Sequence, residues 1–221
     1  MVTGLAIVDA TRFRRDLQEV ADKIGLAREL QPLVEKLTEL YRKGVVKTNH
    51  SVMEIVVAGY LMLKNHENID VEHRLSDILV ADVYGEKLDS RVIVEVETGF
   101  TPPSSATDPL SYLKARIASK IARYSMYAEK MIIAVPPYYA APIPPLMLKP
   151  PKARSKEEII RLKKLLDKYY KNPPISLKEI REARLHTILI VDVDNALAIE
   201  LDPQQYYNIL GKIIRERANY E

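Results

Sequence analysis

The stretch VADVYGEKLDSRVIVEVE, residues 80–97, predicts a β-hairpin that gathers carboxylates on one face. Both arms are rich in β-branched residues, and a turn-forming run centred on Leu88 separates them. This register places Asp82 opposite Glu95, and the alternation of side chains along a strand puts Glu97 on the same face as Glu95. Like charges paired at roughly 5 Å repel each other. A cation would relieve the repulsion, and grouped carboxylate oxygens suit a hard cation such as Mg²⁺.

The same pattern has a second explanation, a solvated strand face with incidental acids. Val94 and Val96 point the other way, and an exposed antiparallel face shows the same alternation. Asp77 is a rival first acid, but it lies an odd number of residues from Asp82 and would face away from Glu95 in an unbulged strand. From the residues alone, a metal site and a solvated acidic face both stay open.

Composition excludes several other kinds of site. The chain has 221 residues, of which 29% are charged and 47% hydrophobic, an ordinary balance for a globular protein. Because cysteine is absent, disulfides, zinc–thiolate sites and thiol catalysis are excluded. The four histidines show no metal-ligand spacing of the HExxH kind, and we expect exposed or structural roles for His50 and His73. A net charge of +3 is compatible with a nucleic-acid partner without requiring one.

No apolar run is long enough to cross a membrane, and the N-terminus lacks a secretory signal pattern. We therefore expect a cytoplasmic protein without a membrane partner. Abundant Ile, Lys, Glu, Tyr and Pro, with few Gly and no Cys, resemble the usage of thermophilic proteins.

Helical and strand patterns alternate along the chain. We expect two helices over 10–43 with a break near Gly25, a helix over 51–65, strands over 71–97, a helix over 109–129 and a strand over 131–135. Ser51 and Glu54 have the spacing of a capping box, with Ser51 as the N-cap. The alternation predicts an α/β fold with a mixed central sheet flanked by helices.

The remaining sequence predicts a proline-rich connector and further α/β elements. The prolines between 136 and 151 exclude regular helix and favour an extended spacer. Ser155 with Glu158 and Ser176 with Glu179 predict capping boxes for helices near 156–171 and 177–184. A hairpin over 187–201 and a helix from Pro203 follow. We divide the chain into an N-terminal helical segment (1–50), a core (51–136), the connector (137–154) and C-terminal helices with a hairpin packed on the core (155–221).

The helix over 109–129 carries a basic face. Its members recur at helical spacing: Arg116, Lys120, Arg123 and Tyr127. One explanation is a solvated face, which long cationic side chains often form. The other is that the face meets a phosphodiester backbone with Lys120 directed at the acids, where an ammonium can stabilise developing charge.

Glu54 on a helix, Asp82 and Glu95-Val96-Glu97 on a hairpin, and the basic helix together resemble the PD-(D/E)XK nuclease superfamily. The 13-residue separation of Asp82 from Glu95 and the Val-Glu-Val-Glu run resemble archaeal Holliday-junction resolvases and a nuclease-like protein of viruses of thermophilic archaea. The resemblance covers roughly residues 51–136. It implies a restriction-endonuclease-like core and a metal-dependent endonuclease that hydrolyses phosphodiester bonds in DNA, with branched or structured DNA as one substrate.

The resemblance also implies roles for single residues. Asp82 and Glu95 would be the main carboxylates that bind Mg²⁺ or Mn²⁺, the Val96 carbonyl a further ligand, and Glu54 an auxiliary acid. The metal would activate a water for in-line attack on the phosphate. Lys114, Arg116 and Arg123 would bind phosphates of the DNA. A twofold dimer is expected for a cut in two strands, in the host cytoplasm if the protein is viral.

Two positions depart from the family pattern. Glu97 stands where the family usually has lysine, and Ala81 stands where it has proline. Lys120 fits the lysine that some branches move to the following helix, with Lys114 as the second choice. We include Glu97 with Lys120 and the three other acids as predicted catalytic residues. Two alternatives remain, a DNA-binding protein that retains the fold without cleaving, and a protein whose acids bind a basic partner.

Overall fold

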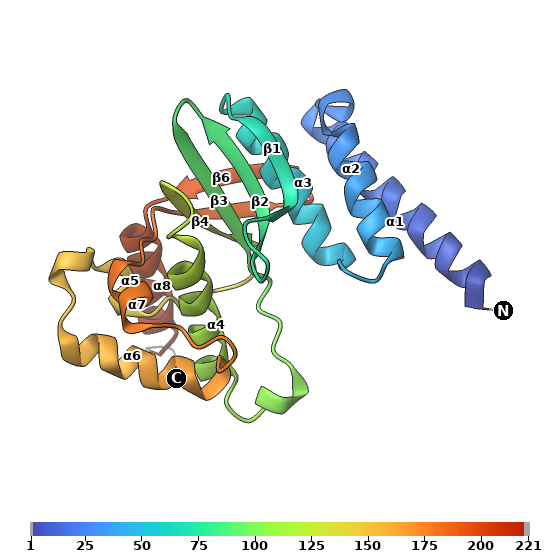
Figure 1. Ribbon diagram of the computed structural model, residues 1–221. Coiled ribbons are helices and arrows are strands. Elements are labelled where there is room, and N and C mark those ends of the chain that lie inside the picture. The colour runs from blue at the N-terminus through green and yellow to red at the C-terminus, as the bar shows by residue number, and fades with distance from the viewer. Residues whose placement is uncertain (1, 219–221) are drawn as a thin grey trace.

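The centre of the fold is one sheet, built from the segments whose β-branched residues predict strands (Figure 1). The computed structural model describes residues 2–218, and side chains over 9–211; residues 1 and 219–221, the outer ends of the first and last predicted segments, lie outside this part. Within it the sheet has six strands: β1 (Glu67–Arg74), β2 (Val80–Lys87), β3 (Ser90–Val96), β4 (Lys130–Val135), β5 (Thr187–Asp192) and β6 (Leu197–Leu201).

The strands follow each other in chain order across the sheet. The pairs β1–β2, β2–β3 and β5–β6 are antiparallel, whereas β3–β4 and β4–β5 are parallel. Each parallel step needs a crossover, and α4 supplies the first one. The predicted α/β class with a mixed sheet is confirmed, and the arrangement is consistent with a restriction-endonuclease-like core.

Helices cover both faces of the sheet (Figure 1). On one face lie α1 (Val2–Ile24), α2 (Ala27–Arg42) and α3 (Thr48–Leu63). On the other lie α4 (Pro109–Tyr124), α5 (Pro145–Leu148), α6 (Lys156–Tyr169), α7 (Leu177–Glu182) and α8 (Pro203–Ala218). Two single 3₁₀ turns occur at Pro103–Ser105 and Pro151–Ala153. No helix among residues 2–218 is long and apolar enough to cross a membrane.

Strand β3 is buried on both faces. Val92, Val94 and Val96 pack in the core with α1 to α3, while Ile93 packs in the core with α4 to α7. The expectation that the acidic face could be solvated is therefore wrong. The reason is the β3–α4–β4 crossover, which lays α4 over that face, as the crossovers between parallel strands do.

The register of the hairpin agrees with the prediction. Val83 pairs with Val94 and Lys87 with Ser90, so the turn lies at residues 88–89 and the next position sets Asp82 against Glu95. Asp77 lies in the loop between β1 and β2, exposed to solvent, and is not part of the acidic face.

Several predicted boundaries differ from the structure. Helix α3 begins at Thr48 with Lys47 at the N-cap and no side-chain cap, so the predicted capping box of Ser51 with Glu54 is wrong. Ser51 is buried inside the helix, where packing overrides the local capping signal. Helix α4 ends at Tyr124 rather than near residue 129, because the chain must leave it to enter β4; Tyr127 therefore does not share its basic face.

The C-terminal half largely follows its local signals. Both capping boxes are present at the starts of α6 and α7, β5 and β6 form the predicted hairpin, and α8 begins at Pro203. The proline-rich connector does contain one short helix, α5, contrary to expectation. Pro145 stands at its first position, where a missing N–H costs nothing. Because β5 pairs with β4, this half completes the central sheet.

Candidate functional site

The site lies at the open end of the predicted hairpin. Registered pairing between β2 and β3 ends at Val83 and Val94, and beyond it two carboxylates bridge the strands. The backbone N–H of Asp82 donates to Glu95 Oε1 at 3.2 Å, and the N–H of Val96 donates to Asp82 Oδ2 at 2.7 Å. Side-chain oxygens thus take the place of ladder carbonyls, which fixes both acids where the strands part.

Lys120 of α4 enters this opening. Its Nζ lies 3.1 Å from Asp82 Oδ2, 3.0 Å from Glu95 Oε2 and 3.0 Å from Glu97 Oε1. It also donates to the carbonyl of Val96 at 3.0 Å. The lysine side chain is 15% exposed and those of Glu95 and Glu97 are 0% exposed. The solvated alternative for the basic face is therefore wrong at Lys120.

The charges of Lys120 and its three carboxylates stabilise one another. Burial alone would lower the pKa of Lys120, but the carboxylates of Asp82, Glu95 and Glu97 raise it well above its usual range. Burial raises the pKa of Glu95, and the charge of Asp82 adds to this. Lys120 is therefore an ammonium ion at neutral pH.

Glu97, the acid in the family's lysine position, has a second cation. Arg116 Nε donates to Glu97 Oε1 at 2.9 Å and to Oε2 at 2.8 Å. Arg116 also donates to the hydroxyl of Tyr112 at 3.5 Å. Although burial opposes it, the charge of Glu97 raises the pKa of Arg116. Glu97 is thus neutralised by two residues of α4, one turn apart.

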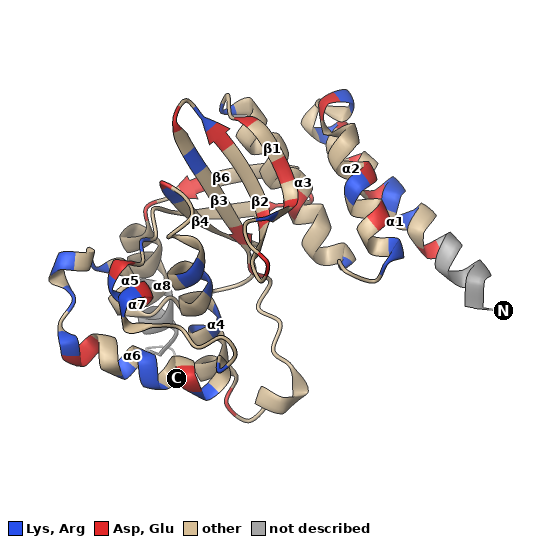
Figure 2. Ribbon diagram, in the orientation of Figure 1, with Lys and Arg blue, Asp and Glu red and all other residues tan. Residues whose placement is uncertain are grey.

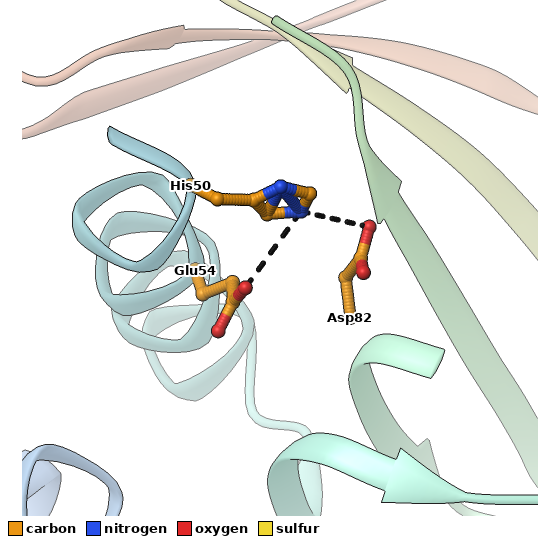
Figure 3. Close-up of side chains that lie close together, drawn as sticks. All are labelled: His50, Glu54 and Asp82. Carbon is orange, nitrogen blue, oxygen red and sulfur yellow. Dashed lines mark ion pairs between the residues drawn. The ribbon is translucent and has the colours of Figure 1, made fainter. Parts of the chain in front are cut away.

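A second group of side chains meets Asp82 from the other face of the sheet (Figure 3). His50 Nε2 lies 3.1 Å from Asp82 Oδ2 and 3.7 Å from Glu54 Oε1. Their possible ligand atoms all lie within 4.8 Å of one another. His50 and Glu54 share a face of α3 because they are four residues apart. The three side chains offer one imidazole nitrogen and two carboxylates to a common point.

Three polar atoms of this second group are buried without a hydrogen bond. Both oxygens of Glu54 and Nε2 of His50 make no hydrogen bond. Burial raises the pKa of Glu54 well above its usual range, helped by the charge of Asp82, and burial lowers the pKa of His50 despite Asp82. Unpartnered buried polar groups are rare and call for an explanation such as an ion. A neutral imidazole with carboxylates is a donor set for a divalent metal.

Most predicted site residues come together here, and some do not. The converging ones are Glu54, Asp82, Glu95, Val96, Glu97, Arg116 and Lys120. Asp82, Glu95 and the Val96 carbonyl, the predicted metal ligands, surround the Lys120 ammonium. Arg123 instead donates to the Pro173 carbonyl at 2.6 Å and lies over the Tyr170 ring. Lys114, two residues before Arg116, faces another side of α4. Figure 2 shows acids at these strand ends and basic residues along α4.

The residue that sequence reasoning missed is His50. Its signal was the four-residue spacing from Glu54, which places two ligands on one helical face. The predicted helix began one residue too late to include it.

No protein-family model, no curated protein and no solved structure matches this chain. The function of the site is therefore inferred from its own residues and their chemistry.

Proposed function

We propose that this protein is a metal-dependent nuclease that hydrolyses phosphodiester bonds in DNA. One observation carries the proposal: Asp82 and Glu95, from two strands, each place a carboxylate oxygen within 3.1 Å of the Lys120 Nζ. Carboxylates that can bind a cation and a lysine that can face a phosphate are what hydrolysis of a phosphodiester needs. The superfamily resemblance in residues 51–136 supports the same conclusion.

The residues fit a divalent metal. Glu54 is buried with no hydrogen bond to either carboxylate oxygen, and its carboxylate and His50 Nε2 converge with Asp82. A metal held by these three residues would supply Lewis-acid stabilisation of negative charge on the scissile phosphate. The imidazole nitrogen favours Mn²⁺ over Mg²⁺, because Mg²⁺ prefers an all-oxygen set.

The other residues would position and neutralise the reacting groups. Lys120, held as an ammonium by its carboxylates, can donate to a phosphate oxygen as charge develops there. Glu97, fixed by Arg116, keeps that ammonium at the site. An acid in the lysine position is therefore compatible with activity, because α4 supplies the cation.

One observation favours the alternative, a DNA-binding protein that does not cleave. Lys120 already forms ion pairs with Asp82, Glu95 and Glu97 in the free protein, so this half of the site is a closed ion network. Such a network could persist as a structural element after turnover is lost. Branched DNA as a substrate and a twofold dimer stay predictions.

A cleavage assay separates the two functions. Labelled single-stranded, duplex and branched DNA are incubated with Mg²⁺, Mn²⁺ or a chelator, using the wild-type protein, Asp82→Asn and Glu95→Gln. Asp89→Asn is the matched control, an exposed acid in the turn of the same hairpin. We expect metal-dependent cleavage by the wild type and the control alone. Binding without cleavage in either metal would establish the alternative, and cleavage by Asp82→Asn would contradict the assignment of the site.

A further inference from the structure

A cleft of about 600 Å³ opens beside the candidate metal group. Its polar and aromatic lining includes Lys47, Asn49, His50, Glu72, Phe100 and Arg116. One wall is the connection from α2 into α3, and the other is the loop that leaves β3 (Figure 1). Because His50 belongs both to this lining and to the metal group, the inner end of the cleft reaches the site.

Phe100 is an exposed aromatic residue in this wall. It is 57% exposed and belongs to neither hydrophobic core. Gly99 turns the chain toward it with a φ of +78°, and a Cβ at Gly99 would lie 2.6 Å from the ring of Tyr139. The backbone at Gly99 therefore passes so close to the Tyr139 ring that only glycine fits there, and the next residue, Phe100, lies exposed in the wall of the cleft.

A cation accompanies the ring. Lys47 Nζ lies 5.5 Å from the centroid of the Phe100 ring. Aromatic faces that stack on bases, next to basic side chains that contact the backbone, are the means by which proteins bind single-stranded nucleic acid. Arg116 adds a second cation to the lining, and Glu72 is the one acid among the described residues of that lining.

The geometry points to a nucleotide site: the cleft takes one unpaired nucleotide of DNA, with its base on Phe100 and a phosphate at Lys47. This inference rests on the proposed function and narrows its substrate to single-stranded DNA or unpaired strands. The volume lies within the range of about 300–1,000 Å³ for sites of small ligands, too small for a duplex. A paired and stacked base cannot present its face to the Phe100 ring unless it leaves the helix. The neighbouring phosphodiester would then lie at His50 and Asp82.

Phe100→Trp provides a direct probe, because the chain contains no tryptophan. The full-length variant, in chelator to prevent cleavage, is titrated with a short oligothymidylate and with a duplex of the same length. We expect saturable quenching of the tryptophan emission by the single strand and none by the duplex. Equal quenching by both, or no quenching while anisotropy shows binding, would overturn the inference.

Affinity provides the second test. Replacing a stacking aromatic with alanine costs about 5- to 150-fold in affinity for a single strand. Phe100→Ala should show such a loss in the anisotropy of labelled oligothymidylate, and Phe100→Trp should retain the wild-type affinity. Tyr207→Ala, which removes an exposed aromatic on α8, an element none of whose described residues lines the cleft, should have no effect. An unchanged affinity of Phe100→Ala would overturn the inference.

The two proposals fail in different ways. If the wild type cleaves duplex DNA in metal and neither binds nor cleaves single strands, the nuclease stands and the nucleotide site is overturned. If single strands bind and quench as expected but no metal supports cleavage, the nucleotide site stands and the nuclease fails.

Discussion

Replacing Lys120 with methionine would remove the ammonium and keep an unbranched side chain that is one atom shorter. Asp82 and Glu95 would then face each other without the Lys120 charge between them. The side chain of Glu95 is 0% exposed. Removing one partner of a buried ion pair costs about 3–5 kcal/mol, because it leaves an uncompensated charge. We expect a loss near 3 kcal/mol, the lower end, because Glu97 keeps its two contacts to Arg116 and Glu95 can take up a proton.

The loss should depend on pH. Burial already raises the folded-state pKa of Glu95, and the Lys120 charge opposes this rise, so loss of the ammonium raises the pKa of Glu95 further. The folded variant then binds more protons than its unfolded chain. The free energy of unfolding of Lys120→Met then falls as the pH rises from the unfolded-state pKa to the folded-state pKa. The difference from wild type should be largest at neutral pH and shrink toward about pH 4, the usual pKa of a carboxyl.

Urea unfolding followed by far-ultraviolet circular dichroism, at pH 7 and pH 4.5, measures both effects. Lys168→Met is the matched control, since it breaks an exposed ion pair with Asp108 and should not shift the midpoint. A loss below about 1 kcal/mol at pH 7 for Lys120→Met, or an equal loss at both pH values, would refute the reasoning about buried charge.

Three further substitutions test other parts of the account. Because burial raises the pKa of Glu54, the stability of the metal-free wild type should fall as the pH rises above about 4.5, and Glu54→Gln should make this fall smaller. The difference is about 1.4 kcal/mol for each pH unit by which burial raises the pKa, measured by urea unfolding at several pH values. An unchanged pH profile would contradict the burial of Glu54. Gly99→Ala should lower the free energy of unfolding by at least about 1–2 kcal/mol, because its φ is +78° and the added Cβ would also meet the Tyr139 ring at 2.6 Å. It should also weaken single-strand binding by displacing Phe100; wild-type stability and affinity would argue against the assigned role of the turn. Arg154→Lys should cost about 2–4 kcal/mol in the same unfolding assay, because one ammonium cannot reach the carbonyls of Lys149, Ile180 and Arg181 together; a loss within error would show that these hydrogen bonds contribute little.

Features set by neighbouring residues could be predicted from the sequence. The hairpin register follows from the alternation of β-branched residues around a short turn, and it correctly placed Asp82 against Glu95. Ser155 and Ser176 each carry a complete capping box, and each begins a helix where the box predicts. These signals act within a few residues, so distant parts of the chain do not alter them.

Features set by tertiary packing could not be predicted in the same way. Ser51 gives a stronger capping signal than Lys47, yet α3 begins at Thr48 and carries His50 into the site. The burial of Lys120 depends on the crossover that lays α4 on β3, which periodicity alone does not reveal. An amphipathic basic face has the same pattern whether water or three carboxylates cover it.

The most direct test of the account is the single-turnover rate of DNA cleavage in Mn²⁺ by the wild type and by Asp82→Asn. Among the described side chains, Asp82 is the one that forms ion pairs with both His50 and Lys120. Its loss should remove several kcal/mol of charge stabilisation and lower the rate on the order of 10³-fold. Asp89→Asn should cleave at the wild-type rate. Equal rates for Asp82→Asn and the wild type, or no cleavage by the wild type, would contradict the proposed nuclease site.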